Sequence, residues 1–269
     1  MGVIRLPIPI LTEGNRIRDV ETKSKVVTSV IADTTKVMEK GDNYRGIQTF
    51  IAGGLEKIGS VSDKQGIYAL VGKMAYKSAW LVAVKLLMQD EKDDGVEGLY
   101  ICPRCQEKKV CEFNEDKELD TRDYLSDLVV RYMEDGDPST VVHKLESPVS
   151  LIDEDKNEQI IEKLELDFPT LNHCSKAFGK YGDRDEIRLQ LAVFVQALRK
   201  VNDDEVDDKF KTMFGMYIFE HMDKNDTREI TKKTEIYGLD TRVQKSCNKC
   251  GKKFEVNLST ANFFVGALH

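Results

Sequence analysis

The sequence lacks the long apolar runs of a membrane protein. No stretch of its 269 residues approaches the roughly 20 consecutive apolar residues that a membrane-spanning helix needs. The first residues, Met1 to Pro7, also lack the basic stretch and apolar core of a secretory signal. These absences predict a cytosolic protein that does not attach to a membrane.

Histidine is scarce as well, with four residues in the chain. Three of them, His143, His221 and His269, have no companion at a spacing typical of metal ligands. His173 precedes Cys174, but adjacent residues of a helix point about 100° apart, which excludes a catalytic Cys-His pair between them. No other group of residues suggests catalysis, so the sequence predicts a protein that is not an enzyme.

Acidic residues outnumber basic residues, 47 against 40, and the net charge is −7. The excess lies between Glu118 and Asp240, where 29 residues are acidic and 17 are basic, whereas the rest of the chain holds 18 and 23. The apolar fraction of 41% fits a folded protein with a charged surface. Because an acidic body repels a phosphate backbone, the charge disfavours nucleic acid as the main partner.

Hydrophobic periodicity predicts a helical N-terminal part. Residues 3–15 contain Pro7 and Pro9 and are expected to form an extended arm or an edge strand. Apolar residues then recur every three or four positions, which predicts helices at about 20–38, 44–58 and 62–88. The pair Gly53-Gly54 lies inside the second of these helices, where small residues allow a neighbouring helix to pack closely.

A second helical part is predicted in the acidic middle of the chain. A helix is expected at 121–134, and the stretch 141–151, which contains Pro148, is expected to form two extended pieces. Further helices are predicted at about 154–164, 169–179, 184–201, 204–222 and 226–235.

Four of the six cysteines form two C-x-x-C pairs, Cys102 with Cys105 and Cys247 with Cys250. Short stretches of alternating apolar and polar residues flank each pair and predict a β-hairpin around the turn. Two thiolates three residues apart at such a turn supply half of a tetrahedral zinc site. The sequence therefore predicts one Zn²⁺ site made by all four cysteines. Two separate redox motifs are the alternative, although neither pair precedes an evident helix.

A site of four thiolates leaves no open coordination position, so the expected role of the Zn²⁺ ion is structural. The 141 residues between Cys105 and Cys247 require a helical domain inserted between the two knuckles of the ribbon. The predicted fold class is mainly α with a small β zinc ribbon (α+β). Its parts are an extended arm and helical bundle, the split zinc ribbon and the acidic helical insertion, at 1–95, 96–118 plus 241–269, and 119–240.

Two lysines follow each pair of cysteines, Lys108 and Lys109 after the first and Lys252 and Lys253 after the second. They could form a basic tip that contacts nucleic acid, as in other zinc ribbons. The sequence favours the other interpretation, in which they are solvated turn lysines that offset the charge of the thiolates.

Several segments carry a resemblance to a known family. They are Leu6-Pro7-Ile8-Pro9, the entry from Tyr100 to Cys105, Leu166-Asp167-Phe168-Pro169-Thr170, the stretch from Val243 to Gly251, and Phe263-Phe264. In this order, and with a long acidic insertion between the cysteine pairs, the chain resembles the baseplate hub assembly proteins of T-even-type contractile-tailed bacteriophages. The resemblance spans most of the chain.

The resemblance implies a virally encoded, non-enzymatic protein that helps to assemble the central hub of the tail baseplate. Such a protein would bind other tail proteins, as a chaperone or as a hub component, in the host cytoplasm or in the virion tail. The alternative hypothesis is a nucleic-acid-binding zinc-ribbon accessory factor, which a salt-dependent shift with DNA or RNA would support.

Overall fold

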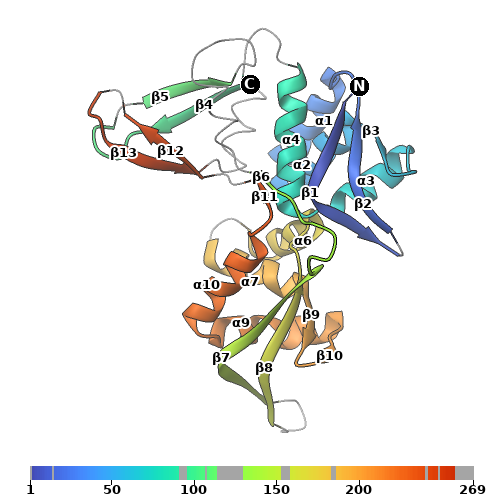
Figure 1. The fold of residues 1–269 in the computed structure, drawn as a ribbon, viewed down its shortest axis with the longest axis vertical. Coiled ribbons are helices and arrows are strands. Elements are labelled where there is room, and N and C mark those ends of the chain that lie inside the picture. Colours follow the sequence, from blue (N-terminus) through green and yellow to red (C-terminus); the bar gives the residue numbers. More distant parts are fainter. Residues whose placement is uncertain are drawn as a thin grey trace.

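The N-terminal part begins with a three-stranded antiparallel sheet. Figure 1 shows the computed structural model, which describes residues 2–13, 15–90, 96–106, 108–113, 130–152, 158–182, 186–239, 242–247 and 249–257. Strands β1 (Val3–Thr12), β2 (Asn15–Thr22) and β3 (Leu55–Ile58) pair in the order β1-β2-β3. The predicted edge strand is thus confirmed, and its pairing with β2 is interrupted between Arg5 and Ile10, where Pro7 and Pro9 lie.

Four helices pack against this sheet. They are α1 (Thr28–Glu39), α2 (Asn43–Gly54), α3 (Lys64–Gly72) and α4 (Tyr76–Asp90). The predicted helices at 20–38 and 44–58 are therefore wrong at one end each, because residues 20–22 and 55–58 pair as strands. The predicted helix at 62–88 is broken, since the backbone of Met74 and Tyr76 hydrogen-bonds to residues 169–171. The largest fully buried side chains of this core are Trp80, Phe50, Leu6 and Met74.

The two adjacent glycines of α2 allow close helix packing, as predicted. A Cβ atom on Gly53 would lie 2.6 Å from Val30 Cγ2 on α1. A Cβ atom on Gly54 would lie 2.7 Å from Leu86 Cδ1 on α4. Both distances are too short for real atoms, so the contacts of α2 with α1 and α4 depend on these glycines.

A four-stranded antiparallel sheet forms the centre of the second part. It contains β7 (Thr140–Ile152), β8 (Glu158–Asp167), β9 (Leu198–Val201) and β10 (Asp204–Glu205), in the order β10-β9-β8-β7. The helix predicted at 154–164 is wrong, because the described part of it lies in β8. The two extended pieces predicted at 141–151 are confirmed, since the pairing of β7 with β8 shifts between Lys144 and Val149.

Helices cover this second sheet and share a core with it. They are α7 (Glu186–Ala197), the continuous run α8 (Asp208–Phe210), η1 (Lys211–Gly215) and α9 (Met216–His221), and α10 (Lys224–Thr234). Helix α6 (Leu171–Tyr181) instead packs against α2 and α7, and its Leu171 belongs to the core of the N-terminal part. The predicted helices at 169–179 and 226–235 are confirmed. Those at 184–201 and 204–222 are wrong at one end each, because residues 198–201 form β9 and residues 204–205 form β10. Buried Leu164 and Leu166 of β8 meet Phe194 and Phe219 in the core of the second part.

The two parts contact each other at a joint. The hydroxyl of Ser175 on α6 donates to the carboxylate of Asp42 at 3.0 Å, and the backbone of Met74 and Tyr76 hydrogen-bonds to residues 169–171. The N–H of Met133 donates to the carbonyl of Pro7 at 2.7 Å. Beside this joint, β6 (Val130–Arg131) pairs with β11 (Gly238–Leu239). Residues 121–129 of the helix predicted at 121–134 lie outside the described residues. Near the end of this predicted helix, Val130 and Arg131 form the strand β6.

Two hairpins complete the described structure and lie to one side of the N-terminal part (Figure 1). Strand β4 (Val96–Ile101) pairs with β5 (Lys108–Phe113), and β12 (Arg242–Ser246) pairs with β13 (Lys253–Asn257). The α+β class is confirmed, but strands are not confined to these hairpins. Among the described residues, no helix combines the length and apolarity needed to cross a bilayer.

Candidate metal centre

The turns of the two hairpins bring four cysteines together. Cys102 and Cys105 follow β4, and Cys247 and Cys250 follow β12. The Sγ atoms of all four lie within 4.8 Å of one another. The four residues predicted from the sequence are therefore close enough to coordinate one metal ion.

The two turns have the same local geometry. In each, the N–H of the residue after the second cysteine donates to the carbonyl of the first, from Gln106 to Cys102 at 3.0 Å and from Gly251 to Cys247 at 2.8 Å. These donors have positive φ values, 58° for Gln106 and 66° for Gly251. This left-handed residue turns the chain back into the second strand, and glycine adopts it without strain.

Backbone hydrogen bonds favour the thiolate form of the first cysteine in each turn. The pKa of the Cys102 thiol is lowered to about 6, chiefly by a hydrogen bond from the backbone of Cys105 and further by one from Arg104. The pKa of Cys247 is lowered in the same way, by the backbone of Cys250 and then of Lys249. Because metal ions bind the thiolate, both turns are prepared for a cation.

The distances between the sulfur atoms fit a tetrahedral ion. Zn–S bonds of about 2.3 Å place the corners of a tetrahedron about 3.8 Å apart. The Sγ atoms of Cys102 and Cys250 are 3.7 Å apart, and those of Cys105 and Cys247 are 3.6 Å apart. Cys102 and Cys247 are almost fully buried, whereas Cys105 and Cys250 are half-buried. The four cysteines therefore match a metal site that has no open coordination position and lies near the protein surface.

Of the four lysines that follow the cysteines, Lys108 and Lys109 belong to β5, and their side chains lie outside the described part of the structure. Lys252 and Lys253 are exposed beside the second turn. The aromatic pair Phe263-Phe264 also lies outside the described residues.

His143, which has no companion at a metal-ligand spacing in the sequence, has a distant partner in the structure. Its Nε2 atom lies 2.7 Å from Oδ1 of Asp226 on α10, and both side chains are buried. The backbone N–H of Glu146 donates to the same carboxylate at 3.0 Å. Because the two residues are 83 positions apart, no local pattern could have revealed this pair, which holds α10 on β7.

His173 also has a structural partner. It is the third residue of α6, and its Nδ1 atom accepts a hydrogen bond from the N–H of Thr170, whose hydroxyl accepts from the N–H of His173. Burial lowers the pKa of His173 to about 4, so the ring stays neutral and keeps this lone pair. The neighbouring Cys174 is buried, and burial raises the pKa of its thiol to about 12.

Comparisons with models of known families, with curated proteins and with solved structures give no match to this chain.

Proposed function

We propose that the chain is a non-enzymatic assembly protein in which a structural zinc ion joins two distant segments, and that it acts on the baseplate hub of a contractile phage tail. The close approach of the four cysteines is the observation that supports the structural zinc ion. The family resemblance of the sequence supports the role in the phage tail.

The donor set favours zinc as the resident metal. Four thiolates in a tetrahedral arrangement are typical of structural zinc sites and of iron–sulfur proteins. Sulfur atoms 3.6 and 3.7 Å apart suit one central ion bound directly by all four. With all four positions filled by the protein, the ion has no position left for a substrate or a reactive water, which supports a structural role.

The zinc would stabilise a contact that the hairpins cannot make alone. A single two-stranded hairpin is at best marginally stable in water. In the described residues, β4-β5 and β12-β13 form two separate sheets. An ion bound to both turns would therefore join them into one ribbon, and its binding free energy would contribute to the folding free energy.

The pairing of β6 with β11 supports the insertion of a domain between the two halves of the ribbon. Leu239 lies opposite Val130, and Gly238 lies opposite Arg131. The chain thus enters and leaves residues 132–237 at neighbouring points. Such an arrangement lets the two halves of the ribbon meet across a large separation in sequence.

The proposed role in the tail is supported by two segments of the family resemblance, which lie close to each other in the fold. Pro7 of the Leu6-Pro7-Ile8-Pro9 segment accepts a hydrogen bond from the N–H of Met133 in the second part, and Ile8 is hydrogen-bonded to Ser78 within the N-terminal part. Phe168, from a second segment of the resemblance, lies in the same small cluster as Ile8. These segments support a protein that holds its two parts in a fixed relation while it binds hub subunits.

The direct test is co-expression of the chain with candidate hub proteins of contractile phage tails, followed by purification and measurement of zinc in the complex. We expect a stable complex that contains one zinc ion per chain. A Cys105→Ser/Cys250→Ser variant is expected to lose the zinc and to form less of the complex. Failure to bind any tail protein contradicts the assembly role.

The same preparation tests the alternative function. A nucleic-acid-binding zinc-ribbon protein would shift a DNA or RNA probe in a salt-dependent manner, and Lys252→Ala/Lys253→Ala would weaken that shift. Binding of this kind without binding to tail proteins would replace the proposed function with the alternative.

A further inference from the structure

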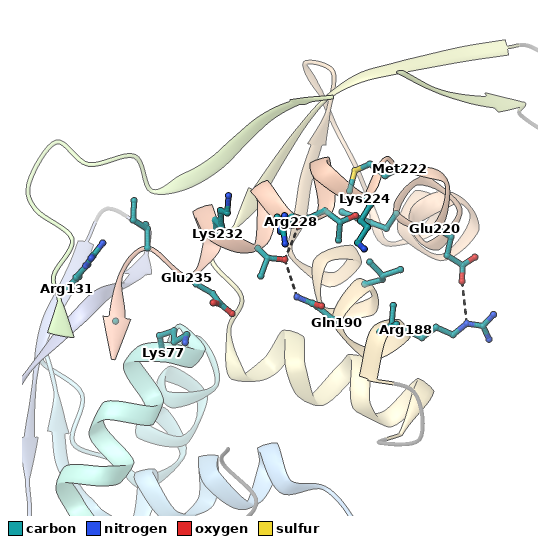
Figure 2. Close-up of a pocket in the computed structure, with 17 residues that line it drawn as sticks. Lys77, Arg131, Arg188, Gln190, Glu220, Met222, Lys224, Arg228, Lys232 and Glu235 are labelled. Carbon is teal, nitrogen blue, oxygen red and sulfur yellow. Dashed lines mark hydrogen bonds and ion pairs between the residues drawn. The ribbon is translucent and has the colours of Figure 1, made fainter. Parts of the chain in front are cut away.

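A cleft of about 1180 Å³ lies away from the cysteines, between the two parts of the chain. Figure 2 shows its walls: Lys77 comes from α4, Arg188 and Gln190 come from α7, and Lys224 and Arg228 come from α10. Small-molecule sites usually measure about 300–1,000 Å³, so this cleft exceeds their upper limit. Its size suits a segment of another protein better than a metabolite.

The walls of the cleft are basic although the chain as a whole is acidic. The basic residues that line it are Lys77, Arg131, Arg188, Lys224, Arg228 and Lys232, and the acidic ones are Glu220 and Glu235. This local excess of positive charge contrasts with the net charge of −7. The cleft therefore attracts a negatively charged ligand.

Two of these basic side chains already form ion pairs with carboxylates. Arg188 lies 3.6 Å from Glu220, and Lys232 lies 2.5 Å from Glu229. By contrast, Lys77, Arg131, Lys224 and Arg228 form no ion pair with any carboxylate in the described part of the chain. Four positive charges around one cleft are thus available to a ligand.

The cleft also offers apolar surface. Leu191, Phe219 and Met222 line it and belong to the buried core of the second part. Ile187 and Ile236 line it too and are 72% and 47% exposed. Exposed isoleucines beside cations fit a ligand that has both apolar and acidic side chains.

Helix α10 holds the basic wall in place. Its opposite face is fixed by buried Asp226 and Ile230, and the carboxylate of Asp226 binds His143 of β7. Lys224 and Arg228 are one helical turn apart and are both exposed on the cleft side. The charges are therefore presented by a supported helix, which reduces the ordering cost of binding.

We propose that this cleft binds an acidic, amphipathic segment of a partner protein, with carboxylates facing Lys224 and Arg228 and apolar side chains covering Ile187 and Ile236. The inference rests on the proposed function only in that the chain acts by binding proteins, and it requires neither the zinc nor the phage tail. A nucleic acid fits less well, because its phosphate backbone would leave the isoleucines exposed and would be repelled by the net charge of −7 of the chain.

The test is a selection from a display library of random peptides against the purified full-length chain, with a Lys224→Glu/Arg228→Glu variant as the counter-target. We expect enriched peptides that combine Asp and Glu with Leu, Ile or Phe. Their binding should weaken roughly tenfold or more in the variant and should also weaken as salt is raised. Circular dichroism checks that the variant is folded, and Lys224→Ala/Arg228→Ala replaces it if it is not.

A charge-matched control separates the cleft from the overall charge. Lys25 and Lys209 are exposed lysines that do not line the cleft, so Lys25→Glu/Lys209→Glu should leave binding of the selected peptides unchanged. Equal losses in both double variants would show a non-specific charge effect and would overturn the proposal. A fluorescent poly-dT probe is tested in parallel, and binding of this probe that depends on Lys224 and Arg228 would assign the cleft to nucleic acid instead.

The outcomes also distinguish this inference from the proposed function. If no peptide prefers the wild type to the cleft variant, while the chain still binds a hub subunit, the cleft proposal is wrong and the assembly role stands. If acidic peptides bind the cleft while no tail protein binds the chain, the cleft proposal stands and the phage role is wrong.

Discussion

The Sγ atom of Cys102 lies 3.7 Å from that of Cys250, although 148 positions separate the two residues in the sequence. Cys105 and Cys247 face each other in the same manner at 3.6 Å. Each close contact therefore joins one hairpin to the other, and neither hairpin holds the site alone. The site belongs to two distant segments of the chain, so its loss is expected to affect both.

The first prediction concerns substitution of a single cysteine on either side. Cys105→Ser and Cys247→Ser should each release the metal and destabilise both hairpins, because each variant retains only three thiolates. Hydrogen exchange of β4-β5 and β12-β13 measures this effect. The control is Cys174→Ser, at a buried cysteine outside the cluster, which should keep the metal. Loss of protection confined to the mutated hairpin would indicate two independent turns.

The second prediction concerns the buried carboxylate of Asp226. Asp226→Ala should cost about 1–3 kcal/mol of the free energy of unfolding, because it leaves buried His143 and the N–H of Glu146 without their hydrogen-bond partner. Urea denaturation measures the change. Glu229→Ala, on the same helix, removes an exposed ion pair and should leave the free energy of unfolding nearly unchanged. Similar values for the two variants would refute this role of Asp226.

The third prediction compares two helical glycines. Gly53→Ala should destabilise the protein by about 1–3 kcal/mol, because the new methyl group would overlap Val30 of α1. Gly179 lies within α6 and has open space at the Cβ position, so Gly179→Ala should stabilise the protein by about 0.5–1 kcal/mol. Thermal unfolding of both variants distinguishes them, and a stabilised Gly53→Ala protein would contradict the close packing of α1 and α2.

The fourth prediction is a pH dependence caused by His173. Its pKa is about 4 in the folded chain against an ordinary value of 6.5. Between these values the unfolded chain binds a proton that the folded chain does not, so stability falls as the pH drops from 6.5 towards 4. In His173→Gln, which keeps an acceptor for the N–H of Thr170 without titrating, the decline should be smaller. Denaturant unfolding across this pH range tests the difference, and an identical decline would exclude His173 as the cause.

The metal centre could be predicted from the sequence because its signal is local. Each C-x-x-C spacing reports a turn, and finding the spacing twice indicates that the turns belong to one site. Helix α6, in which Leu171, Cys174, Ala177 and Phe178 recur every three or four positions, was predictable for the same reason. In both cases the information lies within a few neighbouring residues.

Features that depend on distant partners could not be predicted. Residues 158–167 contain three Glu, two Leu, one Gln and one Lys, which favour helices, yet pairing with β7 and β9 makes them a strand. The contact of His143 with Asp226 joins elements that share no sequence pattern. The basic cleft is assembled from residues of the helices α4, α7, α9 and α10 and the strands β6 and β11, which are far apart in the sequence.

The most direct measurement for the central claim is the metal content of the purified wild-type chain together with X-ray absorption at the metal edge. The expected result is one zinc ion per chain, surrounded by four sulfur atoms at about 2.3 Å. A metal content near zero after purification without chelators, or a zinc ion bound by nitrogen or oxygen in place of the four cysteines, would contradict the account.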